Sequence, residues 1–102
     1  MSERLNSKVA IITGAGSGIG RETSLLFLEE GAQVVLADIN QTTLEETMNL
    51  VSQKGFKDNA ISVIADVSKE AAIESMVKSA MDEFGQLDLL FNNAGLGGAF
   101  GS

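Results

Sequence analysis

The 102-residue sequence predicts a single α/β domain with a doubly wound parallel sheet, in the order βαβαβαβ. Strand-sized apolar runs alternate along the chain with segments whose apolar residues recur at helical spacing. The runs are nearly continuous, which is typical of parallel strands that helices cover on both faces. Right-handed crossovers through the helices then place helices on both sides of the sheet.

The first strand and helix are predicted on either side of a glycine-rich loop. Residues 8–13 (KVAIIT) form a β-branched run that suits a buried strand, and a helix follows over 18–30. We expect the core-facing stripe of this helix to be Ile19, Thr23, Leu26, Phe27 and Glu30. Gly31 ends the helix, because glycine accepts the left-handed conformation found just past many helix ends.

A second strand and helix follow directly. Residues 33–38 (QVVLAD) predict the strand, and Asn40 is a suitable N-cap for a helix that runs to about residue 54. Its core face is predicted to be Leu44, Met48 and Val51, and Gly55 marks its end.

The second half of the chain repeats this alternation. Residues 60–65 (AISVIA) predict a third buried strand, and Ser68 is the expected N-cap of the third helix. The wide apolar stripe of this helix comprises Ala72, Ile73, Met76, Val77, Ala80, Met81 and Phe84. Gly85 ends the helix, and residues 87–92 (LDLLFN) predict the fourth strand.

The composition argues against several functional classes. A net charge of −7 with scattered basic residues disfavours a nucleic-acid partner. The apolar runs are far shorter than the ~20 residues of a membrane span. Without Cys or His the chain lacks the commonest metal ligands, so we predict no metal site. The polar start MSERLNSK is no secretory signal, and we therefore expect a cytoplasmic protein.

The loop TGAGSGIG, residues 13–20, places four glycines between the first strand and the first helix. Glycines let the backbone approach a ligand closely, and the helix N-terminus offers unpaired N–H groups that suit a pyrophosphate. A merely tight turn is the plainer alternative, but it needs only one or two glycines. The spacing fits neither G-x-G-x-x-G nor a P-loop, and reads T-G-x-x-x-G-I-G instead.

That pattern resembles the short-chain dehydrogenase/reductase family. The sequence NNAG at residues 92–95 resembles the family's second motif, and the pair Asp66–Val67 matches its adenine-contacting pair after the third strand. The resemblance extends over residues 8–95 and implies a Rossmann-like fold with a nicotinamide cofactor. A different Rossmann-type protein, such as a methyltransferase, is disfavoured by the glycine spacing and by NNAG.

Cofactor contacts follow from the resemblance position by position. The glycine loop lines the pyrophosphate and nicotinamide-ribose side, Asp66 faces the adenine amino group with Val67 beside the ring, and the NNAG segment borders the adenosine ribose. Asn93 is expected to brace the sheet rather than touch the ligand. The predicted cofactor-binding residues are Gly14, Gly16, Ser17, Gly18, Ile19, Gly20, Asp38, Ile39, Asp66, Val67, Asn92, Ala94 and Gly95.

Asp38 predicts which nicotinamide cofactor is preferred. It ends the second strand, 18 residues after Gly20, close to the ~20 expected for the acid that binds the adenosine ribose. A carboxylate there accepts hydrogen bonds from both ribose hydroxyls and repels a 2′-phosphate. Relatives that prefer NADP tend to carry a basic residue where this chain has Ser17 or Ile39, so we predict NAD. Arg21 is interpreted as a residue on the helix surface.

No catalytic residue is predicted in this chain. The resemblance implies a Tyr acid/base, assisted by a Lys, a Ser and an Asn, all beyond the NNAG motif, and the chain contains no Tyr. Members of the family are considerably longer. We therefore expect residues 1–95 to be the cofactor-binding half of an enzyme that acts on a secondary alcohol or ketone. Residues 96–102 form a glycine-rich tail. A non-catalytic nucleotide-binding module, or an inert fragment, is the alternative.

A sheet truncated after the fourth strand would leave LDLLF as an apolar edge. Unpaired edges invite association with another chain. We therefore expect marginal stability, or a homo-oligomer or other association through this edge.

Overall fold

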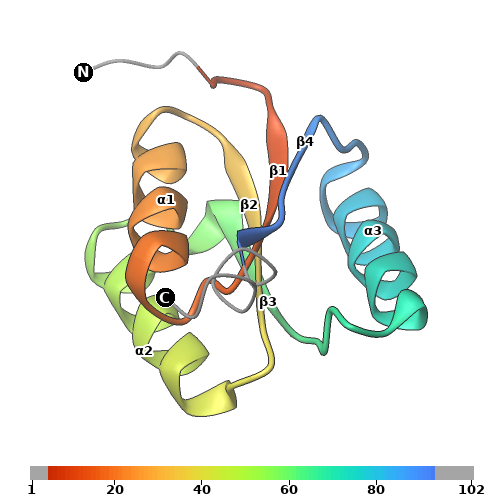
Figure 1. Cartoon of the computed structure of the whole chain (residues 1–102). Helices are drawn as coiled ribbons and strands as arrows, with labels where there is room; N and C mark the ends of the chain where they lie inside the picture. The colour runs from red at the N-terminus through yellow and green to blue at the C-terminus, as the bar shows by residue number, and fades with distance from the viewer. Residues whose placement is uncertain (1–4, 94–102) are drawn as a thin grey trace.

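The computed structural model describes residues 5–93 and contains a four-stranded parallel sheet flanked by helices (Figure 1). The elements are β1 Val9–Thr13, α1 Gly18–Glu29, β2 Gln33–Asp38, α2 Gln41–Gln53, the short 3₁₀ helix η1 Lys57–Asn59, β3 Ala60–Ile64, α3 Glu70–Phe84 and β4 Leu89–Phe91. The strand order is β3-β2-β1-β4, with every pair parallel. The predicted doubly wound α/β fold is confirmed; η1 was not predicted.

Helices cover both faces of the sheet. Helices α1 and α2 pack on one face and α3 on the other, as Figure 1 shows. Side chains of the central strands alternate between these layers: Val34 and Leu36 join the α1/α2 core, whereas Val35 joins the α3 core. Both central strands are buried on both faces, as their continuous apolar runs predict. Among residues 5–93, no helix is long and apolar enough to cross a membrane.

The predicted core face of α1 is only partly correct: Phe27 packs against the core, but Ile19 and Leu26 do not belong to the buried face. Ile19 and Leu26 are 68% and 53% exposed, whereas Leu28 is 1% exposed. The buried residues of this helix are Gly20, Ser24, Leu25 and Leu28. Two small residues, Gly20 and Ser24, therefore belong to the packed face, where they let the helix lie close to its neighbours. The Ser24 hydroxyl donates to the Gly20 carbonyl at 2.8 Å, which satisfies this buried polar group.

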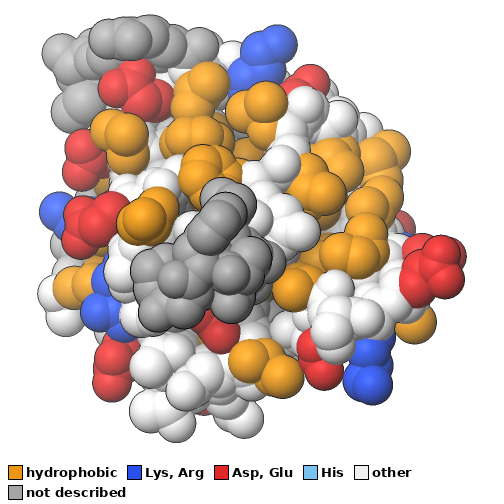
Figure 2. Space-filling model, in the orientation of Figure 1, with side chains coloured by type: hydrophobic (Ala, Val, Ile, Leu, Met, Phe, Trp, Pro, Cys, Tyr) orange, Lys and Arg blue, Asp and Glu red, His pale blue; other side chains and the backbone are white. Residues whose placement is uncertain are grey.

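The two outer strands differ from the predicted buried strands. β3 lies at one edge of the sheet and is only partly buried, with Ile64 53% exposed. β4 is shorter than predicted, and Leu89 and Leu90 are 40% and 49% exposed. Within the described residues, β4 pairs with β1 alone. Figure 2 shows hydrophobic side chains on the face where β4 and α3 lie.

Helix ends agree with the sequence in four of five places, and Gly31 and Gly55, which follow α1 and α2, have φ of 98° and 88°. The Asn40 side chain caps α2 by accepting a hydrogen bond from the Thr43 N–H at 3.1 Å. Gly85 ends α3 in the left-handed conformation, with φ of 82°. The predicted N-cap of α3 is wrong: Lys69 occupies the cap position without a side-chain cap, and the Ser68 hydroxyl donates to Asp66 instead.

The start of β4 is joined to β1 by Asp88. The Val9 N–H donates to Asp88 Oδ2 at 2.9 Å, and the Asp88 N–H donates to the Val9 carbonyl at 2.8 Å. The hydrogen bond from the Val9 N–H, together with one from the Gln86 side-chain amide, holds the pKa of the Asp88 carboxyl below its ordinary value. The short fourth strand is therefore fixed at its first residues by a side chain as well as by the sheet.

A matched pair of substitutions tests the corrected face of α1. Leu28→Ala should lower the free energy of unfolding by about 2–5 kcal/mol, because it leaves a cavity in the α1/α2 core. Leu26→Ala makes the same change at an exposed position of the same helix and should cost much less. Urea denaturation measures both values; equal losses would show that the assigned face is wrong.

Candidate functional site

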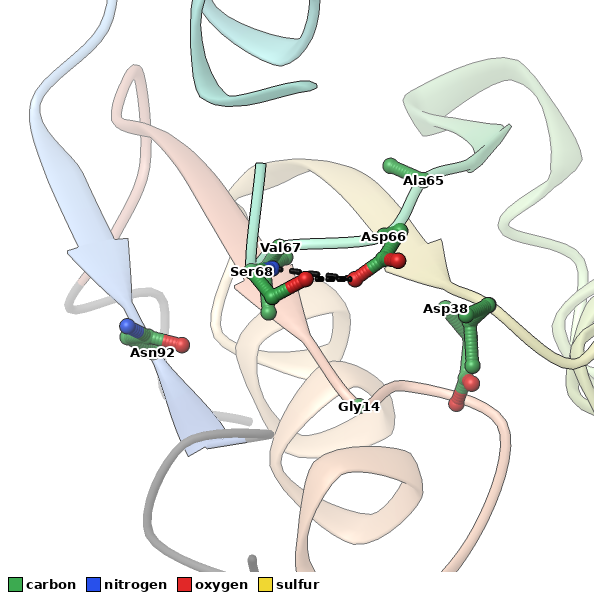
Figure 3. A pocket seen from close by; sticks show the side chains of 8 residues that line it. Gly14, Asp38, Ala65, Asp66, Val67, Ser68 and Asn92 are labelled. Atoms are coloured by element: carbon green, nitrogen blue, oxygen red, sulfur yellow. Dashed lines mark hydrogen bonds between the residues drawn. The ribbon is translucent and has the colours of Figure 1, made fainter. Parts of the chain in front are cut away.

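The carboxyl ends of all four strands meet at one edge of the sheet, where the structure has a pocket of about 380 Å³ (Figure 3). Its lining residues are Gly14, Asp38, Ile39, Ala65, Asp66, Val67, Ser68 and Asn92. They follow β1, β2, β3 and β4. Parallel pairing brings these segments together, because it aligns the strands' carboxyl ends, and ligands of open α/β sheets bind at such an edge.

The glycine loop turns from β1 into α1 beside this pocket. Gly14 and Gly18 have φ of 64° and 57°, in the left-handed region that favours glycine. Gly20 has another role: a Cβ there would collide with the Gly14 carbonyl group, 2.6 Å from its carbon. A Cβ on Gly16 would lie 2.7 Å from Asp38 Oδ2 and closer still to the Thr43 hydroxyl. The loop therefore packs against α1, α2 and the end of β2 with no room for a side chain at Gly16 or Gly20.

Asp38 joins the loop to the end of β2. Its Oδ2 accepts a hydrogen bond from the Gly16 N–H at 2.8 Å, and its Oδ1 accepts one from the Asn40 N–H at 3.0 Å. The carboxylate also lines the pocket. One side chain thus fixes the loop and presents negative charge to the cavity.

The Asp66 side chain is held in place by Ser68, two residues further along the chain. The Ser68 hydroxyl and the Ser68 N–H both donate to Asp66 Oδ1, at 2.6 and 3.0 Å. These two hydrogen bonds, with the nearby charge of Lys69, hold the pKa of the Asp66 carboxyl below its ordinary value. Asp66 is therefore a second carboxyl group of the pocket, and its hydrogen bonds favour the charged form. Ser68 and Ala65 line the pocket but were not among the predicted site residues.

Asn92 lies on the other side of the pocket in Figure 3, with Gly14 between it and Asp38. Its Oδ1 accepts a hydrogen bond from the Thr13 hydroxyl at 2.9 Å. The first residue of the glycine loop is therefore bonded to the end of β4, a contact that the sequence did not predict. Asn93 lies close to α1: its Nδ2 would be 3.0 Å from a Cβ on Gly20.

The other seven predicted residues divide into three groups. Ser17, Gly18 and Ile19 are exposed at the start of α1, beside the pocket lining rather than in it, and Gly16 and Gly20 are buried in the loop. Ala94 and Gly95 lie outside the described residues. The structure thus brings together Gly14, Asp38, Ile39, Asp66, Val67 and Asn92, and their contacts with a ligand stay predictions. Within residues 5–93, no group of three or more acidic, His or Cys side chains could hold a metal ion.

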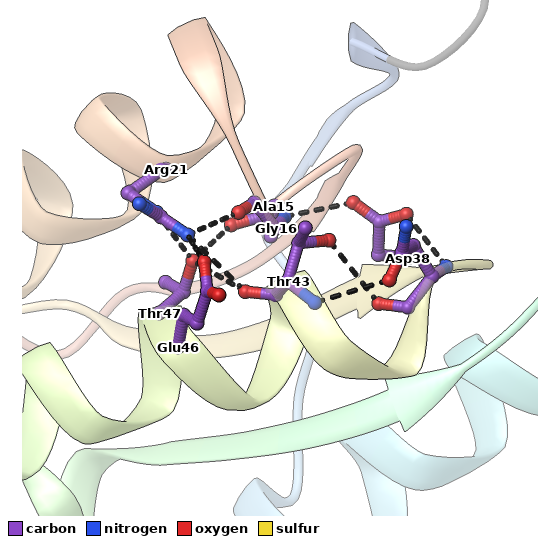
Figure 4. Close-up of polar contacts among 8 residues, drawn as sticks. Ala15, Gly16, Arg21, Asp38, Thr43, Glu46 and Thr47 are labelled. Atoms are coloured by element: carbon purple, nitrogen blue, oxygen red, sulfur yellow. Dashed lines mark hydrogen bonds and ion pairs between the residues drawn. The ribbon is translucent and has the colours of Figure 1, made fainter.

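The interpretation of Arg21 as a surface residue is wrong. Its side chain is only 23% exposed and reaches from α1 to both the loop and α2 (Figure 4). It donates to the Gly16 carbonyl, and also to Thr47 and Thr43 of α2. The sequence carries one signal of this contact: Thr47 lies at core spacing between Leu44 and Val51. The structure shows that Thr47 is fully buried, and a buried hydroxyl requires a polar partner.

Comparison with known proteins decides the family. The family model for short-chain dehydrogenases matches residues 8–101. The chain belongs to the short-chain dehydrogenase family. A short-chain dehydrogenase/reductase, astE, from Aspergillus oryzae is 47% identical over 93 residues, covering 90% of this chain and 35% of that protein. A cyclohexanol dehydrogenase from Acinetobacter is 40% identical over 102 residues and is covered to 40% of its length.

Solved structures of the family share this fold. Glucose dehydrogenase of Caenorhabditis elegans in the apo form superposes with a TM-score of 0.82 at 41% identity, over 85% of this chain and 37% of that one. A short-chain dehydrogenase from Burkholderia phymatum in complex with NAD gives 0.79 at 36% identity, over 85% and 30%. This short-chain dehydrogenase chain thus spans 30% to 40% of the length of the curated relatives and solved structures cited here.

Replacing Ser68 tests the cause of the low Asp66 pKa. Ser68→Ala removes the shorter of the two hydrogen bonds, so the pKa of Asp66 should rise toward its ordinary value. Because the folded-state pKa is depressed, the stability from this contact is present above the unfolded pKa and is lost as the pH falls through the folded pKa. Carboxyl NMR titration measures the shift. The pKa of Asp88, which other groups lower, should not move.

Gly20→Ala tests the close packing of loop and helix. Ala in place of Gly normally stabilises a helix interior, by up to about 1 kcal/mol. Here the new methyl group would collide with the Gly14 backbone, and we expect a net loss of about 1–3 kcal/mol in the free energy of unfolding. Glu22→Ala, at an exposed position of the same helix, is the control. A Gly20→Ala protein as stable as wild type would contradict the packing.

Proposed function

We propose that this chain binds NAD at the edge formed by the strand ends, as the cofactor-binding part of a short-chain oxidoreductase. The whole enzyme would transfer a hydride between C4 of nicotinamide and a secondary alcohol or ketone. One observation carries the proposal: the Asp38 carboxylate lines the pocket and is bonded to the glycine loop at the same time.

The residues present fit a dinucleotide. The loop is closed to side chains at Gly16 and Gly20, which is the packing expected where backbone N–H groups must approach a pyrophosphate. Ile39 and Val67 supply apolar lining for an adenine ring, and Asp66 supplies an ionised acceptor for its amino group. The Asp38 carboxylate would accept hydrogen bonds from the hydroxyls of the adenosine ribose.

The charge pattern supports NAD over NADP. A 2′-phosphate would lie beside the Asp38 carboxylate, and juxtaposed like charges cost several kcal/mol. The positions where a compensating cation would be expected hold Ser17 and Ile39, which are uncharged. The guanidinium of Arg21 is bonded to the loop, to α2 and to Glu46. The relative from Burkholderia phymatum in complex with NAD agrees with a nicotinamide cofactor.

When bound, the nicotinamide would supply the hydride chemistry, and the protein's share is to hold and orient it. This chain contains no Tyr, so we propose that the acid–base group of the reaction lies outside these 102 residues. The residues described here then bind and position the cofactor without exchanging a proton with the substrate.

Cofactor affinity measured by calorimetry tests the proposal. Wild-type protein should bind NAD more tightly than NADP, and Asp38→Asn should shrink the ratio of the two dissociation constants by roughly tenfold or more, because it removes the repelling charge. This ratio reports on Asp38 specifically, because damage to the loop would weaken the binding of NAD and NADP to the same extent.

Two results would contradict this function. A wild-type protein that binds neither cofactor would exclude it, and an unchanged ratio in Asp38→Asn would exclude the role of Asp38. Asp58→Asn, which removes a carboxylate in η1 outside the pocket, controls for net charge. If NAD binds but no alcohol is oxidised even by the full-length protein, a non-catalytic nucleotide-binding module is the better description.

A further inference from the structure

We propose that Arg21 is a positioning residue: it holds the Gly16 carbonyl toward α2, so that the Ser17 N–H of the same peptide group, rather than that carbonyl, faces the cofactor's pyrophosphate. The proposal rests on the proposed binding of a dinucleotide. It assigns Arg21 no contact with the ligand; the residue acts through the loop.

The guanidinium joins the loop to α2 with four hydrogen bonds. Nε donates to the Thr47 hydroxyl at 2.8 Å, and Nη2 donates to the Gly16 carbonyl. Nη2 also reaches the Thr43 carbonyl at 3.3 Å and Glu46 Oε1 at 3.2 Å (Figure 4). The acceptors thus come from two separate segments, and the planar, forked guanidinium can bond to both at once.

Thr47 extends this contact to the preceding peptide group. Its buried hydroxyl accepts from Arg21 and donates to the Ala15 carbonyl at 2.9 Å. Hydrogen bonds linked in such a chain strengthen one another, above all in a buried setting. The carbonyls of Ala15 and Gly16, two consecutive loop residues, are therefore both fixed on the side of α2.

The planarity of the peptide bond converts carbonyl direction into N–H direction. In a trans peptide the C=O and the following N–H point in opposite directions, and the described chain has no cis peptide. With the Ala15 carbonyl held by Thr47, the N–H of the same peptide group, that of Gly16, donates to Asp38 and so fixes the loop rather than binding a ligand. With the Gly16 carbonyl held by Arg21, the Ser17 N–H points away from the guanidinium, at the start of α1. The partial negative charges of both carbonyls are thereby turned away from an anion at the helix end.

The ion pair with Glu46 is expected to contribute little to the position of the Arg21 side chain. The Glu46 side chain is 58% exposed, and exposed ion pairs contribute little to stability. The hydrogen bonds of Arg21 to the Thr47 hydroxyl and to the Gly16 and Thr43 carbonyls are part-buried, whereas the one to Glu46 is exposed. Glu46→Gln should therefore leave ligand binding close to wild type.

The test compares ligands with and without a pyrophosphate, using full-length protein and NMR or calorimetric titration. Arg21→Met keeps the aliphatic stem and removes all four hydrogen bonds. We expect NAD and ADP-ribose to bind roughly tenfold more weakly, whereas adenosine, which lacks phosphate, should change less than about twofold. Thr47→Val, which loses the hydroxyl and keeps the shape, should give a smaller change of the same pattern and provides a second route if Arg21→Met does not fold.

Arg21→Lys separates positioning from direct attraction. Lysine keeps the charge but has one nitrogen in place of the Nε and Nη2 that bond to Thr47 and Gly16 from fixed positions, so NAD binding should be weakened nearly as much as in Arg21→Met. Lys78→Met removes a cation from the exposed Lys78–Asp82 pair of α3 and should leave every affinity unchanged. The proposal is overturned if Arg21→Lys binds NAD like wild type, or if NAD and adenosine weaken equally. If wild-type protein binds no NAD, the proposed function fails instead.

Discussion

The Gly14 carbonyl lies against the bare Cα of Gly20, so the chain passes from β1 into α1 with no space for a side chain between them. This contact sets where α1 begins relative to the sheet. It brings the helix N-terminus over the carboxyl edge of the strands, where β2, β3 and β4 also end. The pocket forms at that edge because the loop is held back against the helix and does not cross the strand ends.

The alternation of strands and helices was predictable because the central strands are buried on both faces and the helices end at glycines. Local patterns of this kind hold without knowledge of neighbours. The core face of α1 was not predictable in the same way. Its buried face combines Leu25 and Leu28 with the small residues Gly20 and Ser24, whereas Ile19 and Leu26 are exposed. The burial of Gly20 follows from its close contact with the Gly14 backbone, which apolar periodicity does not reveal.

The site shows the same division. Motif spacing identified the residues at the strand ends, and the structure gathers six of the thirteen predicted ones around one pocket. Contacts between segments distant in sequence were missed. Arg21 and Thr47 are 26 residues apart, and Thr13 and Asn92 are 79 apart. Such pairs depend on how helices and strands are placed in space. The core spacing of Thr47 indicates that it is buried, but it does not identify Arg21 as its partner.

The exposure of β4 depends on what surrounds it. Leu89 and Leu90 belong to a strand that is paired on one side within the described residues, and apolar strand edges of this kind tend to acquire a neighbour. The family relatives are longer than this chain, which gives the sheet of a complete short-chain dehydrogenase more chain with which to cover such an edge.

Asp38 has a consequence for attempts to redesign cofactor choice. The carboxylate that would exclude a phosphorylated ribose is also the acceptor for the Gly16 N–H and the Asn40 N–H. Removing its charge therefore leaves two backbone donors to be satisfied, one in the loop and one at the start of α2. An engineered preference for the phosphorylated cofactor needs a neutral acceptor at position 38 as well as a new cation. Without that acceptor, the altered selectivity would come with a glycine loop that has lost the hydrogen bond at the Gly16 N–H.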